Sequence, residues 1–541
     1  MSRTLKATVR TAIAALATGV LAFLPITQAH AADYVPISGA GSSWSSNALD
    51  QWRRNVEQYG MRINYASTGS SDGRNQFRSG TIDFAVSEIP YGLRDGSVVD
   101  DPPSRPFAYM PIVAGGTAFM YNLSAGGKQI ANLRLSGPVI AKIFTGVITE
   151  WNDPLIAADN PGLDLPARKV VPVVRSDGSG STAQLTMWMA DTQGSIWDKY
   201  CRAAGRSSPC GVTSNFPVIS GKGFIAQPNS QGVAGYVAQA ANVGTITYVE
   251  YSYALKTGFP VAKVLNSAGY YVEPTASNVA VGLLGAKINT TPGNKYLTQI
   301  LDGVYVNDDA RAYPLSSYSY MIIPTSTEAP FTNAKGKTLA AFANYFLCEG
   351  QQQAEVLGYS PLPINLVRAG LDQVGLIPGG GETVTDIAKC NNPTFSKDGS
   401  NTLAKNAPMP DACDKKGATQ CTTATGGAAG AGSGSGAGSG AGSGSGADTG
   451  SGGDSGGFGD GSTSSGSGGG FLGIPVGTGP VTCNADTGVC QNVTAEATNI
   501  DNRVGWGLPQ TVMLVAVALF LMLVFLPPVL VRSIRRGGRG T

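Results

Sequence analysis

The chain has 541 residues, a formal net charge of +2 and only 14% charged side chains. This near balance excludes a surface built to attract nucleic acid or acidic lipid, so we expect no nucleic-acid partner. The single histidine is His30, close to the N-terminus. If the leader that contains it is removed, no Ser-His-Asp triad, Cys-His pair or His-ligated zinc site can form. We therefore expect no cofactor and no enzyme of these kinds, while carboxylate-only catalysis stays open.

Residues 1–32 have the pattern of a secretory signal peptide. Arg3, Lys6 and Arg10 precede an apolar run at 12–24, and Ala29-His30-Ala31 is a small-x-small cleavage site. We therefore expect export across the cell membrane, with the folded part lying at its extracellular face.

Residues 33–400 alternate between strand-like and helix-like patterns, which indicates an α/β fold. Between 42 and 59, apolar residues recur at helical spacing and predict one buried face, closed by Gly60. The residues of this face are Trp44, Ala48, Trp52, Val56 and Tyr59. Strands are predicted at 61–66 and 82–86, and a helix-compatible run opens after Gly69 and ends at Ser79.

The segment from Arg175 to Thr182 is predicted to join a strand to a helix. It follows the apolar run 170–174 and precedes a helix-compatible run at 183–190, with Ser181 and Thr182 at the expected N-cap. Free amides, a positive helix end, hydroxyls and a guanidinium together would bind a tetrahedral oxyanion. From this segment alone, an ordinary Gly/Ser-rich loop is the open alternative.

Two further junctions place glycines and hydroxyls ahead of a helix. They are the segment from Gly39 to Trp44 and the segment Gly69-Ser70-Ser71. If the three junctions face one another, their N–H and hydroxyl groups would form a cage for an anion.

All eight cysteines lie beyond residue 200, in the part of the chain expected outside the cell. Disulfides are therefore expected, although the sequence allows many connectivities. Pairing across the shortest loops predicts Cys201–Cys210, Cys348–Cys390, Cys413–Cys421 and Cys483–Cys490. Metal binding is the alternative, but the sequence has no Cys-x-x-Cys pair.

Beyond residue 400 the sequence predicts an extension, a linker and a membrane anchor. Residues 401–424 hold one cysteine pair, and 425–470 are almost entirely Gly, Ser and Ala, which is typical of a flexible linker. A membrane-proximal segment at 471–507 precedes an uncharged apolar run at 508–531, followed by the arginine-rich tail 532–541. This pattern predicts a single-pass transmembrane helix with the C-terminus inside the cell.

The start of that run, Leu508-Pro509-Gln510-Thr511, resembles a sortase signal of Gram-positive surface proteins. Val512 stands where that signal has glycine. Attachment to the cell wall is therefore the alternative to a plain membrane anchor.

Between Ile37 and Pro363 the chain resembles a known family, the phosphate-binding protein of the phosphate ABC importer. The motifs that carry the resemblance occur in the order and spacing of that family. They are Gly39-Ala40-Gly41, Gly69-Ser70-Ser71, the segment Asp83 to Glu88, Arg175 to Ser181, Gly146 to Trp151, Asn160 to Leu163, Val243-Gly244, Tyr248 to Tyr251 and Tyr313-Pro314-Leu315. The resemblance implies a two-lobed, periplasmic-binding-protein-like (type II) α/β fold with two crossover hinge strands. One lobe would comprise about 33–112 and 318–400, and the other 113–317.

The resemblance also implies a ligand, partners and a set of contacts. Inorganic phosphate would lie in the cleft between the lobes and pass to the permease subunits of the importer. Nine residues match the contacts of the family: Ser43, Trp44 (by its backbone amide), Ser70, Glu88, Arg175, Asp177, Ser179, Gly180 and Ser181. The family usually has aspartate in place of Glu88 and Phe-Pro in place of Trp44-Ser45, so the cleft itself departs from its pattern.

A buried carboxylate at Glu88 would select for phosphate. Phosphate carries a proton near neutral pH and can donate a hydrogen bond to Glu88, whereas sulfate would face it with lone pairs only. Asp177 is expected to hold the Arg175 guanidinium in its fork geometry. A surface acid at 88 and a simple turn aspartate at 177 are the open alternatives.

Two other functions remain from the sequence alone. A surface scaffold or adhesin could keep the receptor fold without transport, and the tether and the change at Glu88 fit it. A secreted phosphatase would need catalytic groups, but beyond the predicted leader the sequence has no histidine, and it has no clustered metal-ligand motif.

Overall fold

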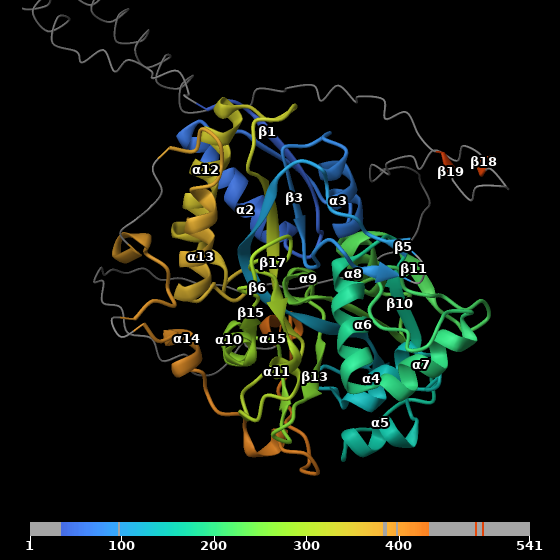
Figure 1. Ribbon diagram of the computed structural model, residues 1–541. Coiled ribbons are helices and arrows are strands. Elements are labelled where there is room, and N and C mark those ends of the chain that lie inside the picture. Colours follow the sequence, from blue (N-terminus) through green and yellow to red (C-terminus); the bar gives the residue numbers. More distant parts are fainter. Residues whose placement is uncertain are drawn as a thin grey trace, which may run out of the picture. The chain divides into compact units, whose positions relative to one another are not determined.

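The computed structural model describes residues 34–95, 98–381, 387–396 and 399–431, and two short strands at 482–483 and 490–491. It divides into two units, Met1–Gly440 and Ala441–Thr541. The first unit holds the α/β fold drawn in Figure 1. In the second, the described residues form one antiparallel pair, β18 (Thr482–Cys483) with β19 (Cys490–Gln491).

One mixed sheet of eleven strands runs through the first unit. Its main path has the order β11-β10-β12-β6-β17-β3-β1-β2, with β9, β13 and β14 attached beside it. The strands of the path are β1 (Ile37–Gly41), β2 (Ile63–Ala66), β3 (Phe84–Ser87), β6 (Phe107–Asn122), β10 (Val171–Arg175), β11 (Ile225–Gln227), β12 (Thr245–Glu250) and β17 (Ser316–Pro324). The attached strands are β9 (Arg134–Leu135), β13 (Val261–Leu265) and β14 (Tyr271–Val272).

Two antiparallel strands, β6 and β17, join two groups of parallel strands. Residues 107–116 of β6 pair with β17, whereas 117–122 pair with β12. On the far side of β17 lie β3, β1 and β2, and on the far side of β12 lie β10 and β11. Because β6 changes partner at Gly116–Thr117, the chain crosses between the two groups at that point.

Two glycines of β6 allow other side chains to pack closely against the strand at the crossing point. A Cβ on Gly115 would lie 2.7 Å from the Trp44 ring, and one on Gly116 would lie 3.0 Å from the Tyr313 ring. Glycine therefore lets side chains from both groups of strands pack onto the crossing strand itself.

The two groups of strands have separate hydrophobic cores, and each core with its helices forms one lobe. The core of lobe 1 contains Trp52, Phe84, Tyr320 and Phe346, and its helices are α2 (Ser46–Val56), α3 (Ser70–Arg78), α12 (Asn333–Leu347) and α13 (Ile364–Val374). The core of lobe 2 contains Phe144, Trp151, Trp197 and Tyr248, and its helices include α4 (Gly137–Phe144), α6 (Gly180–Thr192) and α7 (Gly194–Ala203). Figure 1 shows lobe 1 in blue and yellow above lobe 2 in cyan and green.

A smaller cluster of lobe 2 covers the other face of β12. It is formed with α8 (Asn229–Val237) and α9 (Tyr251–Thr257) and includes Val173, Val233 and Tyr253.

The remaining elements are short. The strands are β4 (Arg94–Asp95), β5 (Val98–Val99), β7 (Ser124–Ala125), β8 (Lys128–Gln129), β15 (Lys287–Ile288) and β16 (Gln299–Ile300), and the helices are α5 (Pro154–Asp159), α10 (Ala276–Gly282), α11 (Asp302–Tyr305), α14 (Thr402–Lys405) and α15 (Ala428–Ala431). The 3-10 turns are η1 (Glu57–Tyr59), η2 (Leu283–Gly285), η3 (Glu349–Gln353), η4 (Ile387–Cys390) and η5 (Ala412–Asp414).

Most elements predicted from the sequence are present with small shifts of their ends. The predicted strands at 61–66 and 82–86 are β2 and β3, and the helix-compatible run ending at Ser79 is α3. The predicted buried face of the first helix is wrong at Tyr59, whose side chain is 48% exposed. The helix ends at Val56, and the 3-10 turn that follows rotates Tyr59 away from the core.

Three disulfides join the cysteines that the shortest loops predicted. They are Cys201–Cys210, Cys348–Cys390 and Cys413–Cys421. Cys483 and Cys490 are backbone partners in the pair β18–β19, and the bond between them stays a prediction.

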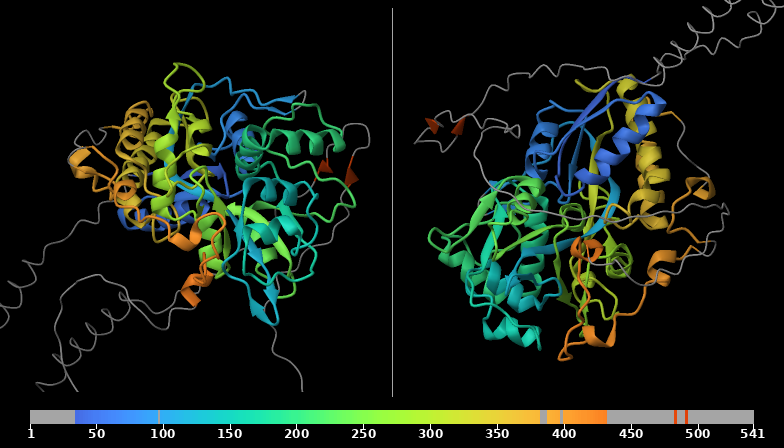
Figure 2. Two further views of the ribbon diagram at one scale, coloured as in Figure 1. Left: turned by 90° about the horizontal axis from the view of Figure 1, so that it is seen from below. Right: turned by 180° about the vertical axis from the view of Figure 1, so that it is seen from behind.

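The segment 391–431, which contains the predicted extension at 401–424, connects the two lobes a third time. Its beginning lies on lobe 1, where Asn392 and Thr394 donate to the carbonyl of Leu362. Ala404 and Ala407 then pack against Ala280 and Ala312. Further on, Asp414 forms an ion pair with Lys263 of β13 at 2.7 Å. Figure 2 shows this segment in orange, passing from beside the yellow helices to the green part of the sheet.

In the part of the chain that the structure describes, no helix is both long and apolar enough to cross a membrane. The predicted signal peptide at 1–32, most of the linker at 425–470 and the predicted span at 508–531 lie outside the described residues.

Arg134 fastens the extension to lobe 2 and provides a test of that contact. Its buried guanidinium donates to the carbonyls of Asp159, Cys413 and Ala418 at 2.8–2.9 Å. Arg134→Ala leaves these acceptors without their donor, so we expect the free energy of unfolding to fall by about 3 kcal/mol. Chemical denaturation of the full chain measures this change. Arg202→Ala, at an exposed arginine of α7, is the control, and equal losses in both variants would contradict the assignment.

Candidate functional site

Three strand-to-helix junctions meet where lobe 1 faces lobe 2. Lobe 1 contributes the junctions β1–α2 and β2–α3, and lobe 2 contributes β10–α6. The backbone N–H of Ser71 donates to the carbonyl of Gly178 at 3.1 Å, and the N–H of Gly180 donates to Ser70 Oγ at 3.1 Å. Of the three junctions predicted to form an anion cage, β2–α3 and β10–α6 are therefore in direct contact, and the N–H of Gly69 joins β2–α3 to the carbonyl of Gly41 before α2.

Arg175 ends β10 and lies almost fully buried beside Asp177. Its Nε donates to Oδ1 of Asp177 at 2.7 Å and its Nη2 donates to Oδ2, so the carboxylate holds one edge of the guanidinium. Asp177 Oδ1 also accepts from the backbone N–H of Asn229 at 2.9 Å. Among the described residues, Nη1 of Arg175 has no hydrogen-bond partner, so one edge of the cation remains available.

The start of α6 differs from the predicted capping pattern. Ser179, and neither Ser181 nor Thr182, is the N-cap, because its hydroxyl accepts from the backbone N–H of Thr182 at 3.2 Å. Ser181 lies in the first turn instead. Its hydroxyl is buried and has no hydrogen-bond partner in the part of the chain described. A buried hydroxyl without a partner is costly unless a ligand binds it.

Tyr248 holds the β10–α6 junction through two hydrogen bonds of its hydroxyl. Its hydroxyl accepts from the backbone N–H of Arg175 at 3.2 Å and forms a 2.7 Å hydrogen bond with Thr182 Oγ1. Burial raises the pKa of Tyr248 to about 12, so its hydroxyl stays protonated at physiological pH.

Glu88 follows β3 and is only 1% exposed, so the prediction of a buried carboxylate agrees with its position. Its Oε1 accepts from the hydroxyls of Ser42 and Ser319, both at 2.5 Å, and its Oε2 accepts from Ser70 at 2.8 Å. A buried carboxylate requires such donors to replace the water that it loses. The Glu88 side chain points across to Gly180, where an added Cβ would overlap Oε2.

The first junction makes other contacts with lobe 2. Ser43 Oγ accepts from the backbone N–H of Ser230 and lies 2.9 Å from its hydroxyl. The hydroxyl of Tyr253 donates to the carbonyl of Ser43 at 2.5 Å. The Trp44 amide donates to Ser42 Oγ at 2.9 Å, and its contact with a ligand stays a prediction. The Trp44 ring packs against Tyr359 and the crossing strand, away from the junctions.

Eight of the nine predicted site residues thus form four groups in the structure, and Trp44 lies outside them. Ser70, Glu88 and Gly180 contact one another across the lobes, Arg175 and Asp177 form an ion pair, and Ser43 pairs with Ser230. Ser179 and Ser181 form the start of α6.

Sequence reasoning missed several polar partners of the site. Ser42 lies inside the first junction and could have been included with Ser43. Ser319 lies in the middle of β17 and Ser230 at the start of α8, without any local motif that marks them. Gln184 of α6 and Gln299 of β16 both donate to the backbone carbonyl of Glu88, at 2.9 and 3.2 Å.

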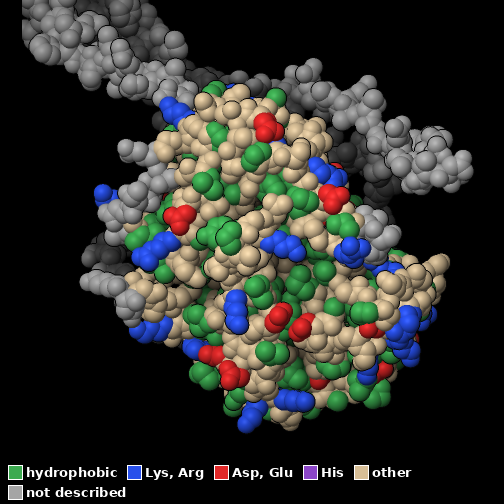
Figure 3. Space-filling model, viewed as in Figure 1, with side chains coloured by type: hydrophobic (Ala, Val, Ile, Leu, Met, Phe, Trp, Pro, Cys, Tyr) green, Lys and Arg blue, Asp and Glu red, His purple; other side chains and the backbone are tan. Residues whose placement is uncertain are grey.

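A groove with a volume of about 440 Å³ lies beside Glu88 between the lobes. Its walls include Arg94, Gln184, Lys295 and Gln299. Arg94 and Lys295 are exposed, so the groove has a positive rim next to the buried site. Figure 3 shows that basic and acidic side chains are otherwise scattered over this face of the molecule.

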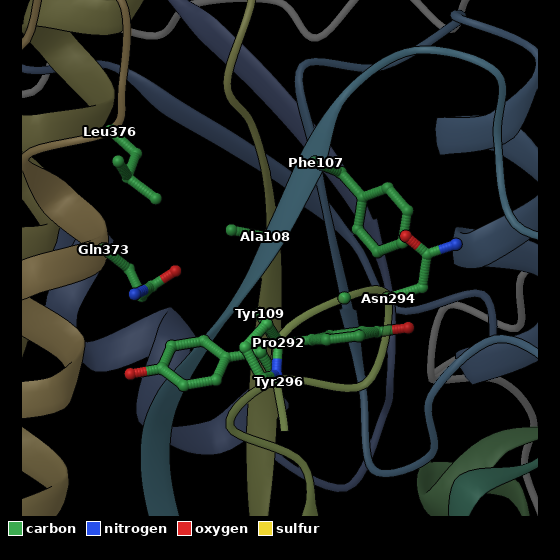
Figure 4. A pocket seen from close by; sticks show the side chains of 9 residues that line it. Phe107, Ala108, Tyr109, Pro292, Asn294, Tyr296, Gln373 and Leu376 are labelled. Atoms are coloured by element: carbon green, nitrogen blue, oxygen red, sulfur yellow. The ribbon is translucent and has the colours of Figure 1, made fainter. Parts of the chain in front are cut away.

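Another cavity, of about 460 Å³, lies away from the junctions. It is bounded by Phe107, Tyr109, Tyr296 and Leu376, as Figure 4 shows, and none of the predicted site residues lines it. Its walls are mostly apolar, and among the described residues no arginine or lysine lines it.

A family model described as a PBP superfamily domain matches residues 26–349. The phosphate-binding protein PstS of Xylella fastidiosa is 33% identical over 336 residues, which cover 62% of this chain and 83% of that protein. PstS 3 of Mycobacterium tuberculosis is 30% identical over 331 residues, covering 60% of this chain and 82% of that protein. A solved phosphate-binding protein from Stenotrophomonas maltophilia has 18% identity and a TM-score of 0.46, and covers 62% of this chain and 93% of that one.

Two lobes joined by crossing strands, with polar junctions facing each other, define a solute-binding protein of the periplasmic type. The chain belongs to the PBP superfamily, and curated relatives that it matches are phosphate-binding proteins named PstS. This confirms the resemblance identified from the sequence motifs.

A substitution of Gly180 tests how closely the two lobes approach each other at the start of α6. In Gly180→Ala the new methyl group would overlap Glu88 Oε2 and approach Ser70, so we expect the lobes to separate, at a cost of about 1–3 kcal/mol. Small-angle X-ray scattering should show a larger radius of gyration. The control is Gly194→Ala, at the first residue of α7, where no atom lies within 4 Å of an added Cβ. Identical scattering from both variants would rule out the close contact.

Proposed function

We propose that this protein is an extracellular receptor that captures inorganic phosphate between its lobes and delivers it to the permease subunits of an ABC importer. The observation that carries the proposal is one buried carboxylate, Glu88, which accepts from three hydroxyls of lobe 1 beside the point where the Gly180 amide of lobe 2 donates to Ser70. The names of the relatives support the same ligand. No chemical conversion of the ligand is part of the proposal.

Phosphate would accept hydrogen bonds from groups that either bond to one another in this structure or have no partner among the described residues. Ser181 Oγ and Arg175 Nη1 have no partner among the described residues, and they supply a neutral donor and a cation. Ser43, Ser70 and the backbone of Gly180 presently join the lobes and could turn to the ligand when the cleft opens and closes around it.

The other predicted contacts take supporting roles in this proposal. Asp177 orients the guanidinium of Arg175, Ser179 caps α6, and the Trp44 amide acts through Ser42. A single cation against a divalent anion leaves the remaining charge to be balanced by dipoles and hydroxyls. This agrees with a surface that has no strong basic field.

The proposal includes a domain layout that rests on the sequence. A signal peptide at 1–32 would be removed, lobe 1 would span about 33–112 and 318–400, and lobe 2 would span 113–317. An extension at 401–424 and the linker 425–470 would lead through 471–507 to a single-pass anchor at 508–531 and a cytoplasmic tail at 532–541. The tether would hold the receptor near its permease at the outer face of the membrane.

Arg175 tests the ligand site directly. Arg175→Ala removes the cation and its hydrogen bonds from a buried site, so we expect phosphate affinity to fall at least about 100-fold. Isothermal titration calorimetry of the full chain with phosphate measures the loss. Arg202→Ala, at an exposed arginine of the same lobe, should bind like the wild type. Micromolar affinity retained in Arg175→Ala would contradict the proposal, and no phosphate binding by the wild type would favour a scaffold function.

Glu88 tests the choice between oxyanions. The wild type should prefer phosphate over sulfate, because only phosphate can donate a hydrogen bond to the carboxylate. In Glu88→Gln the amide can donate to sulfate, so the preference should shrink by about tenfold or more. Parallel titrations with the two anions measure it. Equal affinities of the wild type for both anions would refute this explanation of selectivity.

A further inference from the structure

The first half of β6 has one edge that no other strand covers. Residues 107–116 pair with β17 on one side, and among the described residues no strand pairs with 107–113 on the other side. Pro111 lies within this stretch. Proline has no N–H to give to a neighbouring strand, so within sheets it is confined to such edges and to bulges. An uncovered edge is a template on which another chain can pair.

The backbone groups at the start of this edge have a known direction. The N–H of Thr325 donates to the carbonyl of Pro106 at 3.2 Å, so the backbone of Pro106 faces β17. Because the direction alternates along an antiparallel pair, Ala108 also faces β17, whereas Phe107 and Tyr109 face away from it. Among the described residues, the backbone N–H and C=O groups of Phe107 and Tyr109 have no other hydrogen-bond partner. They are free to pair with an added strand.

The cavity of about 460 Å³ described above lies along this edge. It is lined by Phe107, Ala108 and Tyr109, which are consecutive, although successive side chains of a strand point to opposite faces of the sheet. A space that touches all three has to reach the edge of the strand. Figure 4 shows Ala108 on the side of Gln373 and Phe107 on the side of Asn294, so the cavity has a wall on each face.

Each of these walls carries a side-chain amide without a partner. Gln373, near the end of α13, is only 5% exposed, and its amide makes no hydrogen bond to any described residue. The amide of Asn294, which is exposed, makes none either within the described chain. A primary amide offers donors and an acceptor, as a peptide group does. A buried amide is costly to leave unpaired unless a ligand binds it.

The chemistry of the walls restricts the side chains of such a ligand. Among the described residues that line the cavity there is no arginine, lysine, aspartate or glutamate. A charged side chain would lose water there without gaining a counter-charge. Tyr296 and Leu376, at the walls, are 38% and 50% exposed, so the cavity is open to solvent beside them. The walls therefore suit an extended chain with uncharged side chains.

We propose that the edge of β6 at Phe107 and Tyr109 is a docking site for an extended, uncharged segment of a partner protein, which adds to lobe 1 as a further strand. The free backbone groups of these two residues pair with the main chain of the segment, and the amides of Gln373 and Asn294 bind further peptide groups. In strand addition of this kind, main-chain hydrogen bonds supply affinity and the flanking walls supply specificity. The site is separate from the junctions around Glu88, so this inference goes beyond the proposed function.

The first test is a titration with a peptide that has the predicted properties. The probe is a blocked, fluorescently labelled peptide of sequence Thr-Val-Thr-Val-Thr, because these residues favour strands and carry no charge. Its matched control is Thr-Val-Pro-Val-Thr, in which the central residue has no N–H. Fluorescence anisotropy with the full chain should show binding of the probe and at least about tenfold weaker binding of the control. Equal binding of both, or binding of neither, would overturn the inference.

The second test locates the peptide on the protein. Gln373→Leu removes the buried amide at similar volume, so the affinity for the probe should fall about tenfold. Arg368→Ala, at an exposed residue of the same helix, is the control, and both variants should bind phosphate like the wild type. Tyr296→Ala, on the other wall, is a further variant if Gln373→Leu does not fold by circular dichroism. Unchanged probe affinity in both cavity variants would contradict the site.

The third test identifies the backbone edge itself. Hydrogen exchange resolved to single amides should slow at least about tenfold at Phe107 and Tyr109 when the probe is bound. The N–H of Ala108 faces β17 already, so its exchange should change little and serves as an internal control. A lack of added protection at Phe107 and Tyr109 would overturn strand addition even if the probe binds. Protection of the same amides by self-association of the chain, without probe, would overturn the choice of a partner protein.

Discussion

The burial of the Glu88 carboxylate is the constraint to which much of this structure responds. A charge removed from water must be given hydrogen bonds of comparable strength, or it destabilises the fold by several kcal/mol. Here the donors are the hydroxyls of Ser42, Ser70 and Ser319, all from lobe 1, and Gly180 of lobe 2 leaves room for the carboxylate, because a Cβ at that residue would overlap Oε2. The ends of β1 and β3 and the middle of β17 therefore have to converge on one point, and the register of the sheet satisfies this requirement.

The crossing strand β6 connects the surroundings of Glu88 to the region where the two lobes of such a protein are expected to move relative to each other. Trp44 leaves the junction beside Glu88 and packs its ring on Gly115 of β6, where Glu250 of lobe 2 also approaches. Burial raises the pKa of Glu250 well above its usual range, and its Oε2 accepts from the backbone N–H of Ser252 at the start of α9. The polar residues of the site and the residues packed on the crossing strand, Trp44 and Glu250, are therefore in continuous contact. The segment 391–431 adds a third connection, anchored to lobe 1 near Leu362 and to lobe 2 through Arg134 and Asp414.

Some parts of this arrangement were predictable because they depend on neighbouring residues. The junctions at Gly41, Gly69 and Gly178 were visible as glycines and serines between a strand pattern and a helix pattern, and the short disulfide loops were visible as cysteine spacings. The cap of α6 was assigned to the wrong serine, because several adjacent hydroxyls can satisfy the same pattern and only the backbone angles of Ser179 decide among them. Tyr59 was misplaced because helical periodicity does not show where an α-helix tightens into a 3-10 turn.

The sequence by itself determined the α/β class, the three junctions, the family and the kinds of group that could bind an anion, which are hydroxyls, backbone amides and a guanidinium. These properties are local, since periodicity and turn chemistry act over a few residues. Only the tertiary structure decided which hydroxyls reach Glu88 and that Ser319 and Ser45 join them. Those contacts join residues up to 274 positions apart, and they follow from the pairing of β17 with β3 and β6. No short stretch of sequence specifies such a pairing.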